Sequence, residues 1–237
     1  MAIYALADTH LSLSTPDKAM DVFGPVWENS AEKISKNWRE VVGEEDTVLI
    51  SGDISWATYI DRAVDDFKFL ANLPGRKIIS RGNHDYWWTS IKKMNEFFDA
   101  NGITGIEICR TNVVEAEGAL ITGTRGWMLP QSGMTEHEKK VYDRELERLK
   151  LCVREIEKAD PGRTHKRILM IHYPPVTKQR GSTEFSKLAD DVFDVCVYGH
   201  LHGPAHSMVF EGTAGGSCRY VCTAADYLRF KPVGPII

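Results

Sequence analysis

Five short segments of this sequence carry carboxylate, amide and imidazole side chains of the kinds that hold metal ions. They read Asp8-Thr9-His10, Gly52-Asp53, Gly82-Asn83-His84-Asp85, His172 and Gly199-His200-Leu201-His202. Oxygen ligands of this kind, mixed with imidazole nitrogens, suit Mn²⁺, Zn²⁺ or iron (Fe²⁺/Fe³⁺). No thiolate belongs to the set, which argues against a structural zinc–cysteine site. The chemistry expected of these residues is therefore that of a bound metal.

The spacing within the motifs has a physical reason. In Asp-x-His and His-x-His, alternate residues of an extended segment share one side, so both can face the same ion. A glycine precedes Asp53, Asn83 and His200. Glycine permits a tight turn from strand to loop and a close approach of the backbone. We therefore expect each motif to begin where a strand ends.

The elements needed to position these motifs can be read from the apolar pattern. Strands are predicted over 3–7, 47–51, 77–80, 167–171 and 194–198, and each ends at one of the motifs. Helices are predicted over 30–42, with Ser30 as N-cap, and over 63–73. Strands alternating with helices indicate a parallel or mixed sheet covered by helices. Because the carboxyl ends of parallel strands meet in one crevice, the five motifs are expected to surround a single point.

The remaining segments complete one domain. Short β-like runs over 106–109, 113–116 and 119–122 suggest a meander, and the charged stretch 135–158 predicts a long helix with a solvated face. Two further β-like stretches are predicted over 207–210 and 219–223. No repeat, low-complexity tract or long linker interrupts the chain, so we expect a single domain over residues 1–237.

Composition sets the broad class. The 237 residues are 43% hydrophobic and 26% charged, which is typical of a globular protein with a sizeable core. The formal charge of -4 argues against nucleic acid as the main partner. No signal peptide and no apolar run long enough for a membrane span are recognised. The five cysteines contain no CxxC pair and are expected to be reduced, mostly buried thiols, which favours a cytoplasmic location.

Taken in order, the five motifs closely resemble those of the calcineurin-like metallophosphoesterase family. The resemblance runs from Asp8 to His202 and so covers most of the chain. It implies an α/β sandwich of the four-layer type, with two mixed β-sheets flanked by helices. It also implies a dinuclear metal site at the C-terminal strand ends, and so two divalent or trivalent ions.

The family pattern also implies a role for each residue. Asp8, His10 and His202 would hold one metal, and Asn83, His172 and His200 the other. The carboxylate of Asp53 would bridge the two ions. His84 would lie over the reacting phosphate as an acid or charge stabiliser, with Asp85 orienting its imidazole.

The activity implied is hydrolysis of a phosphate mono- or diester by in-line attack of a metal-bridging hydroxide. Trp56 stands where many relatives carry an acidic residue three positions after Gly-Asp. The arginine-glycine sequence and the Gly-Asn-His-Glu motif of the Ser/Thr protein phosphatases are both absent, which points away from that branch. A small phosphorylated substrate is expected.

Several residues outside the motifs are candidates for substrate contact. Arg125 and Arg180 lie in glycine-punctuated loops and could grip a substrate phosphate. Aromatic residues beside the motifs could wall a pocket or stack on a flat leaving group, although core packing is the alternative for each; they are Trp56, Tyr86, Trp87, Trp88 and Trp127. Two other functions stay open, namely a metal-dependent nuclease with a basic groove and a non-catalytic scaffold.

Overall fold

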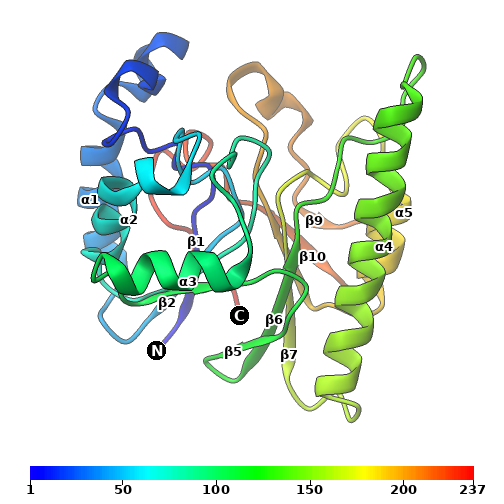
Figure 1. Cartoon of the computed structure of the whole chain (residues 1–237). Coiled ribbons are helices and arrows are strands. Elements are labelled where there is room, and N and C mark those ends of the chain that lie inside the picture. Colours follow the sequence, from blue (N-terminus) through cyan, green and yellow to red (C-terminus); the bar gives the residue numbers. More distant parts are fainter.

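The computed structural model describes residues 1–237 and arranges the strands in two sheets between outer helices (Figure 1). The first sheet has the order β1-β2-β3-β4 and is parallel throughout. Its strands are β1 (Ile3–Ala5), β2 (Thr47–Ile50), β3 (Arg76–Ile79) and β4 (Ile106–Ile108). The helices between them are α1 (Ser30–Val41), α2 (Val64–Ala71) and α3 (Ile91–Ala100). The predicted alternation of strands and helices is confirmed.

The second sheet has six strands in the order β5-β6-β7-β8-β10-β9. Its central pairs are parallel, and the pairs β5–β6 and β9–β10 at its two edges are antiparallel. The strands are β5 (Val114–Ala116), β6 (Ala119–Thr124), β7 (Lys166–Ile171), β8 (Val195–Tyr198), β9 (Gly212–Thr213) and β10 (Arg219–Cys222). Its helices are α4 (Glu136–Ala159) and α5 (Glu184–Asp190). The predicted sandwich is confirmed, except that only this sheet is mixed.

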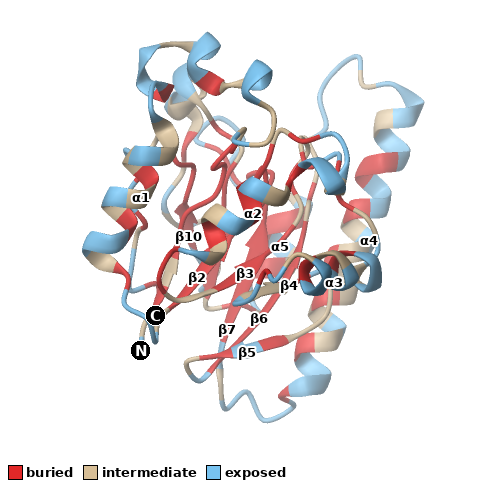
Figure 2. Ribbon diagram, turned by 60° about the vertical axis from the view of Figure 1, so that its left-hand side comes forward, coloured by how far each residue is buried: buried red, intermediate tan, exposed pale blue.

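Alternation along the strands divides the core into three layers. The strands of both sheets are largely buried (Figure 2). Val48 and Ile50 of β2 face the helices of the first sheet, whereas Leu49 faces the second sheet. On β7, Leu169 packs under α4 and α5, and Ile168 lies between the sheets. Successive side chains of a strand point to opposite faces of the sheet. Each parallel strand is therefore apolar on both of its faces, because both are covered.

The long helix α4 begins with a capping box. The Thr135 side chain accepts a hydrogen bond from the Glu138 backbone, and the Glu138 carboxylate accepts one from the Thr135 backbone. This pair satisfies two of the free N–H groups at the start of the helix. Tyr142 and Leu149 are buried against β6 and β7, as predicted, and the charged residues lie on the solvent side except for Glu145, which is fully buried.

Three sequence predictions about local structure are wrong. The segment 105–123 forms no meander, because β4 pairs with β3 in the first sheet while β5 and β6 form a hairpin in the second. Residues 207–210 form no strand, because a 3-10 helix covers Gly203–Met208 with Pro204 in its first turn. Helix α1 is preceded by Asn29 in a left-handed conformation rather than capped by Ser30.

All five cysteines are free and buried, in agreement with the sequence expectation. Burial raises the pKa of the Cys109 and Cys196 thiols well above the usual value. None of the helices is both long enough and apolar enough to cross a lipid bilayer.

Candidate metal centre

The predicted motifs lie beyond the carboxyl ends of β1, β2, β3, β7 and β8. The loops after β1 and β2 are joined directly, because the Asp8 amide donates to the Gly52 carbonyl at 2.9 Å and the His10 amide to the Asp53 carbonyl at 3.0 Å. Parallel strands that end at one edge therefore carry their loops to one place, as the sequence pattern predicts.

Four of the seven predicted ligands have left-handed backbone conformations. The φ angles are 58° for Asp8, 43° for His10, 52° for Asp53 and 74° for His200. For non-glycine residues this conformation costs free energy of about 1–3 kcal/mol each when the surroundings hold it in place. Such strain is concentrated where side chains must converge, and here it turns the four side chains toward a common centre.

Two glycines allow the ligands to approach the neighbouring backbone. A Cβ atom at Gly82 would lie 2.1 Å from Oδ1 of Asp53, and one at Gly199 would lie 2.2 Å from Oδ2 of Asp8. Distances this short are not tolerated between non-bonded heavy atoms, so only glycine fits. The predicted close approach at these glycines is confirmed.

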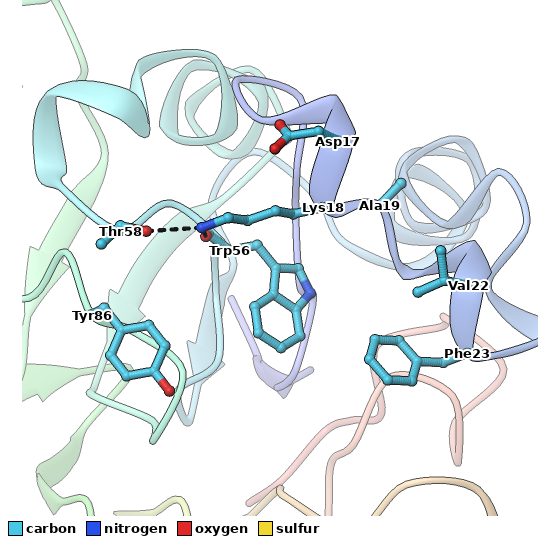
Figure 3. A pocket seen from close by; sticks show the side chains of 8 residues that line it. All are labelled: Asp17, Lys18, Ala19, Val22, Phe23, Trp56, Thr58 and Tyr86. Carbon is cyan, nitrogen blue, oxygen red and sulfur yellow. Dashed lines mark hydrogen bonds between the residues drawn. The ribbon is translucent and has the colours of Figure 1, made fainter.

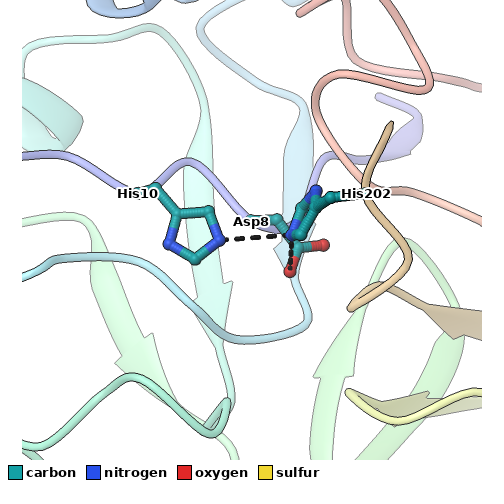
Figure 4. A group of neighbouring side chains, drawn as sticks. All are labelled: Asp8, His10 and His202. Carbon is teal, nitrogen blue, oxygen red and sulfur yellow. Dashed lines mark hydrogen bonds and ion pairs between the residues drawn. The ribbon is translucent and has the colours of Figure 1, made fainter. Parts of the chain in front are cut away.

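Asp8, His10 and His202 form the first group of potential ligands (Figure 4). Oδ1 of Asp8 lies 3.3 Å from Nε2 of His202, and this nitrogen lies 3.2 Å from Nε2 of His10. The three ligand atoms are within 4.8 Å of one another. This spacing leaves room for one ion among them.

The second group surrounds Asn83. Its Oδ1 atom lies 2.7 Å from Nε2 of His172 and 2.9 Å from Nδ1 of His200. Oδ2 of Asp53 lies 3.3 Å from the same His172 nitrogen and 3.8 Å from Nε2 of His10 in the first group. The Asp53 carboxylate therefore stands between the two groups, where a bridging ligand would have to be.

The hydrogen bonding of His172 shows that this site fits a cation. Its Nδ1 atom lies 2.9 Å from the Ser51 carbonyl oxygen, which can only accept, so Nδ1 carries the proton of the neutral ring. The Nε2 lone pair then faces oxygen atoms of Asn83 and Asp53, which are also acceptors. Acceptors facing acceptors are repulsive unless a proton on Nε2 or a metal ion supplies a positive charge between them.

His202 has the same arrangement through Asp226, a residue that the sequence motifs did not include. Nδ1 of His202 donates to Oδ1 of Asp226 at 2.8 Å, so its Nε2 lone pair faces Asp8 and His10. The Gly203 amide donates to the other Asp226 oxygen at 3.0 Å. Metal-binding histidines commonly have such a carboxylate or carbonyl partner on the second nitrogen. Asp226 lies just beyond β10, so extending the strand-end rule to that strand would have found it.

The pKa values reflect the excess of carboxylate charge. Burial by itself lowers the pKa of His172, but the carboxylates of Asp53 and Asp8 raise it to about 9. Burial likewise opposes the charged form of His202, but Asp8 and Asp226 raise its pKa to about 10. For His10, burial is the largest effect and lowers the pKa to about 4. Bound cations would satisfy the same carboxylates without protonating these rings.

Comparison with known proteins places this geometry in a family. The family model of the calcineurin-like phosphoesterases (Metallophos) matches residues 1–204. The chain belongs to the calcineurin-like phosphoesterase family. No curated protein matches the sequence.

Solved structures with calcineurin-like phosphoesterase folds are similar over nearly the whole chain. The phosphopantetheinyl hydrolase PptH from Mycobacterium tuberculosis is 15% identical with a TM-score of 0.59, and the similarity covers 99% of this chain and 96% of that one. The protein TT1561 of Thermus thermophilus is also 15% identical, with a TM-score of 0.57 and coverage of 93% and 87%. Because both sequence identities are only 15%, these similarities show a common fold and nothing more specific. Membership of the family supports a metal-dependent phosphoester hydrolase, and the Asp and His groups described above could hold its two metal ions.

His84 and Asp85 occupy the third motif of this chain. The His84 ring lies 5.8 Å from that of His10, and its backbone amide donates to Oδ1 of Asp53 at 2.7 Å. Burial lowers the pKa of His84. These contacts tie His84 to the ligands without making it one.

The predicted orienting role of Asp85 is corrected by its contacts. The buried carboxylate accepts from the backbone amides of Gly82 at 2.7 Å, Ile54 at 2.8 Å and Asp53 at 2.9 Å, and from the Trp87 indole at 3.0 Å. No hydrogen bond joins it to the His84 ring, whose Nδ1 atom is buried without a partner. Asp85 therefore holds the loops after β2 and β3 together. Sequence adjacency misled the prediction, because the two neighbouring side chains point to different sides of the loop.

The two candidate arginines have different surroundings. Arg125 donates to Oε1 of the fully buried Glu145 at 3.2 Å, and its guanidinium lies 4.5 Å from the Trp127 ring centre. Its charge is thus already paired, and its contacts do not support the predicted grip on a substrate phosphate. Arg180 lines a pocket of about 400 Å³ together with His200, so its role stays a prediction.

The aromatic residues near the motifs fall into two groups, those buried in the core and those that line pockets. Trp87 and Trp88 are buried in the core of the first sheet. Trp56 and Tyr86 line a pocket beside the site, and Trp127 lines the pocket that contains Arg180. Both alternatives foreseen for these residues therefore occur.

Proposed function

We propose that this chain hydrolyses small phosphate mono- or diesters at a dinuclear metal site. The observation that carries the proposal is the pair of ligand groups joined by Asp53, in which histidine lone pairs face carboxylate and amide oxygens. When bound, two ions such as Mn²⁺, Fe²⁺/Fe³⁺ or Zn²⁺ would supply Lewis acidity and a water of lowered pKa. Asp8, His10 and His202 would hold one ion, Asn83, His172 and His200 the other, and Asp53 both.

Hydrolysis requires a proton for the leaving oxygen. One P–O bond forms to the oxygen of water, the P–O bond to the alcohol breaks, and the alkoxide takes up a proton. We assign its donation to His84, which lines a pocket together with His10 and His202 and is fixed to Asp53 through its backbone. A positioned general acid contributes a rate factor of about 10²–10⁴.

A small substrate agrees better with the surroundings of the site than nucleic acid does. A nucleic-acid groove requires several basic side chains that follow the phosphates. Lys18 and Arg180 are the basic residues among those lining the three pockets around the site, and Lys18 is already hydrogen bonded to Thr58. The nuclease alternative is therefore not favoured.

The test is hydrolysis of p-nitrophenyl phosphate and bis-p-nitrophenyl phosphate by metal-stripped protein to which Mn²⁺, Fe²⁺ or Zn²⁺ is returned. We expect turnover only with metal, and the ratio of the two rates separates monoesterase from diesterase. Elemental analysis of the same samples counts the bound ions. A protein that binds no metal and hydrolyses neither ester would sink the proposal.

Two substitutions separate the acid from the ligands. His84→Ala should lower kcat about 10²–10⁴-fold on an ester with a poor leaving group while both metals stay bound. Asp53→Ala should lose metal as well as activity. His137→Ala, which removes an exposed histidine, is the control and should behave as the unchanged protein. Full activity of His84→Ala on the poor leaving group would remove His84 from this role.

A further inference from the structure

An apolar pocket leads outward from the His84 side of the metal centre. Its inner part has a volume of about 410 Å³ and is bordered by His10, His84 and His202. Its outer part, of about 560 Å³, is drawn in Figure 3. Phe23 and Trp56 line both parts, so the two parts adjoin at these side chains.

Stacked rings line this path. The Phe23 ring is stacked on Trp56 with centres 6.4 Å apart and planes 14° apart. Trp56 in turn is stacked on His10 at 5.0 Å and lies 4.5 Å from the ring of His84. A flat or chain-like apolar group that lies along these rings would thus have one end at the metal centre.

Apolar side chains at the outer rim of the pocket are exposed to solvent rather than packed in the core. Val22 is 78% exposed, Phe23 66% and Tyr86 59%, and Val26 of the inner part is 47% exposed. These four are half of the eight large hydrophobic residues that the whole chain exposes. A contiguous apolar patch beside a polar centre is typical of a ligand-binding surface.

Hydrogen bonds of Lys18 join the walls of the outer part. Two short 3-10 helices, Pro16–Lys18 and Met20–Phe23, line the outer part, and a third, Pro25–Trp27, lines the inner part. The Lys18 ammonium donates to Oγ1 of Thr58 at 2.8 Å and so connects the first of these helices to the loop that carries Trp56. Lys18 and Asp17 are the charged residues of the outer part, and their charges are opposite. The pocket is therefore suited to an uncharged group rather than to a second phosphate.

We propose that this pocket binds the apolar part of the leaving alcohol, so that the substrates are phosphate esters of alcohols with an aromatic or extended aliphatic group. The inference rests on the proposed function. A proton donor must lie within hydrogen-bond reach of the leaving oxygen. Because the His84 ring packs beside Trp56, the carbon atoms attached to that oxygen fall against Trp56 and then Phe23.

The pocket on the opposite side of the centre does not suit the leaving group. It has a volume of about 400 Å³ and contains His200, Tyr173 and Arg180, but His84 is not among its lining residues. A group bound there would lie beside the ligands of the second metal and away from the proposed acid. Phe23 and Trp56 are therefore the residues assigned to leaving-group specificity.

The first experiment compares ethyl phosphate with octyl phosphate, which differ in apolar length and hardly in the acidity of the alcohol. With the metal-loaded protein we expect kcat/KM to be at least about tenfold higher for the octyl ester, because its additional methylene groups leave water. Phe23→Ala should reduce this octyl-to-ethyl ratio several-fold. Tyr59→Ala is the matched control, since it removes an exposed aromatic residue outside the pocket and should keep the ratio.

Binding of non-hydrolysable octylphosphonate and ethylphosphonate tests the pocket separately from turnover. We expect octylphosphonate to bind at least about tenfold more tightly, with most of the difference lost in Phe23→Ala. Hydrolysis of both esters with equal kcat/KM would overturn the inference and leave the proposed function intact. Tight, Phe23-dependent binding of octylphosphonate without hydrolysis would support the pocket and contradict the proposed function. Phe23-dependent binding to phosphatidylcholine vesicles, with equal binding of the two phosphonates, would show a lipid-docking patch instead and overturn the inference.

Discussion

Asp226 determines which nitrogen of His202 is available to a metal. Its Oδ1 atom accepts the Nδ1 proton at 2.8 Å, and its Oδ2 atom accepts from Gly203 at 3.0 Å, so the carboxylate also fixes the turn that follows the His-x-His motif. Removing the charge while keeping the shape, as in Asp226→Asn, should lower metal affinity about 10–100-fold. Metal titration followed by elemental analysis measures the change. Asp191→Asn, at an exposed aspartate, is the control.

At Gly199, the addition of a single methyl group should have a large effect on metal binding. An added methyl group would overlap Oδ2 of Asp8, which also accepts the His200 amide. Gly199→Ala should therefore displace the Asp8 carboxylate and weaken metal binding by at least about tenfold. Gly162→Ala adds the same methyl group where the nearest atom is 3.4 Å away. Equal metal content in the two variants would contradict the prediction.

Among the elements, helix α4 is attached to the sheet by charge as well as by its apolar face. Glu145 is fully buried, accepts from Oγ1 of Thr124 at 3.2 Å, and pairs with Arg125 and Arg148. Glu145→Ala would leave Arg125, whose side chain is only 12% exposed, without its partner, which destabilises by up to about 3–5 kcal/mol. Urea unfolding measures the loss, and Glu157→Ala at an exposed position of the same helix should have little effect. A loss below about 1 kcal/mol for Glu145→Ala would mean that Arg125 is free for another role.

The same scale shows why the positions of the candidate ligands were predictable and the contacts that support them were not. Asp8, Asp53 and His172 each follow a buried parallel strand, and strand ends converge whatever the rest of the chain does. The pairing of strands could not be predicted in this way, because the apolar pattern of 106–108 predicts a strand but does not indicate which sheet it joins. The carboxylate of Asp85 binds backbone groups some 30 residues away in sequence, a contact that exists only after both loops are placed.

At the scale of the whole molecule, the two sheets share a core and carry the two halves of the site on their carboxyl ends. Loops of the first sheet supply Asp8, His10, Asp53 and Asn83, whereas the second sheet supplies its histidines after β7 and β8. Ile3, Leu49 and Ile78 of the first sheet pack with Ile168 and Val197 of the second. Because the site joins both sheets, bound metal should stabilise the folded chain as a whole.

Stability of the whole chain should also depend on Lys77, a lysine that the site does not use. It is buried on β3, its ammonium donates to the Leu73 carbonyl, and burial lowers its pKa from 10.5 to about 8. Between these two values the unfolded chain binds more protons than the folded one, so this residue makes the free energy of unfolding rise with pH. Below pH 8 the cost of the buried charge is fully present.

Lys77→Met should therefore be more stable than the unchanged protein at pH 7, by about 1–3 kcal/mol, since no charge has to be buried. The difference should shrink at pH 10, where Lys77 of the folded protein is mostly neutral. Urea unfolding of both proteins at the two pH values measures the difference. Subtracting the curves removes the contribution of the cysteine thiols, which titrate in this range in the unfolded chain only, because burial raises their pKa in the fold. A difference that is equal at both pH values would show that Lys77 keeps its proton in the fold.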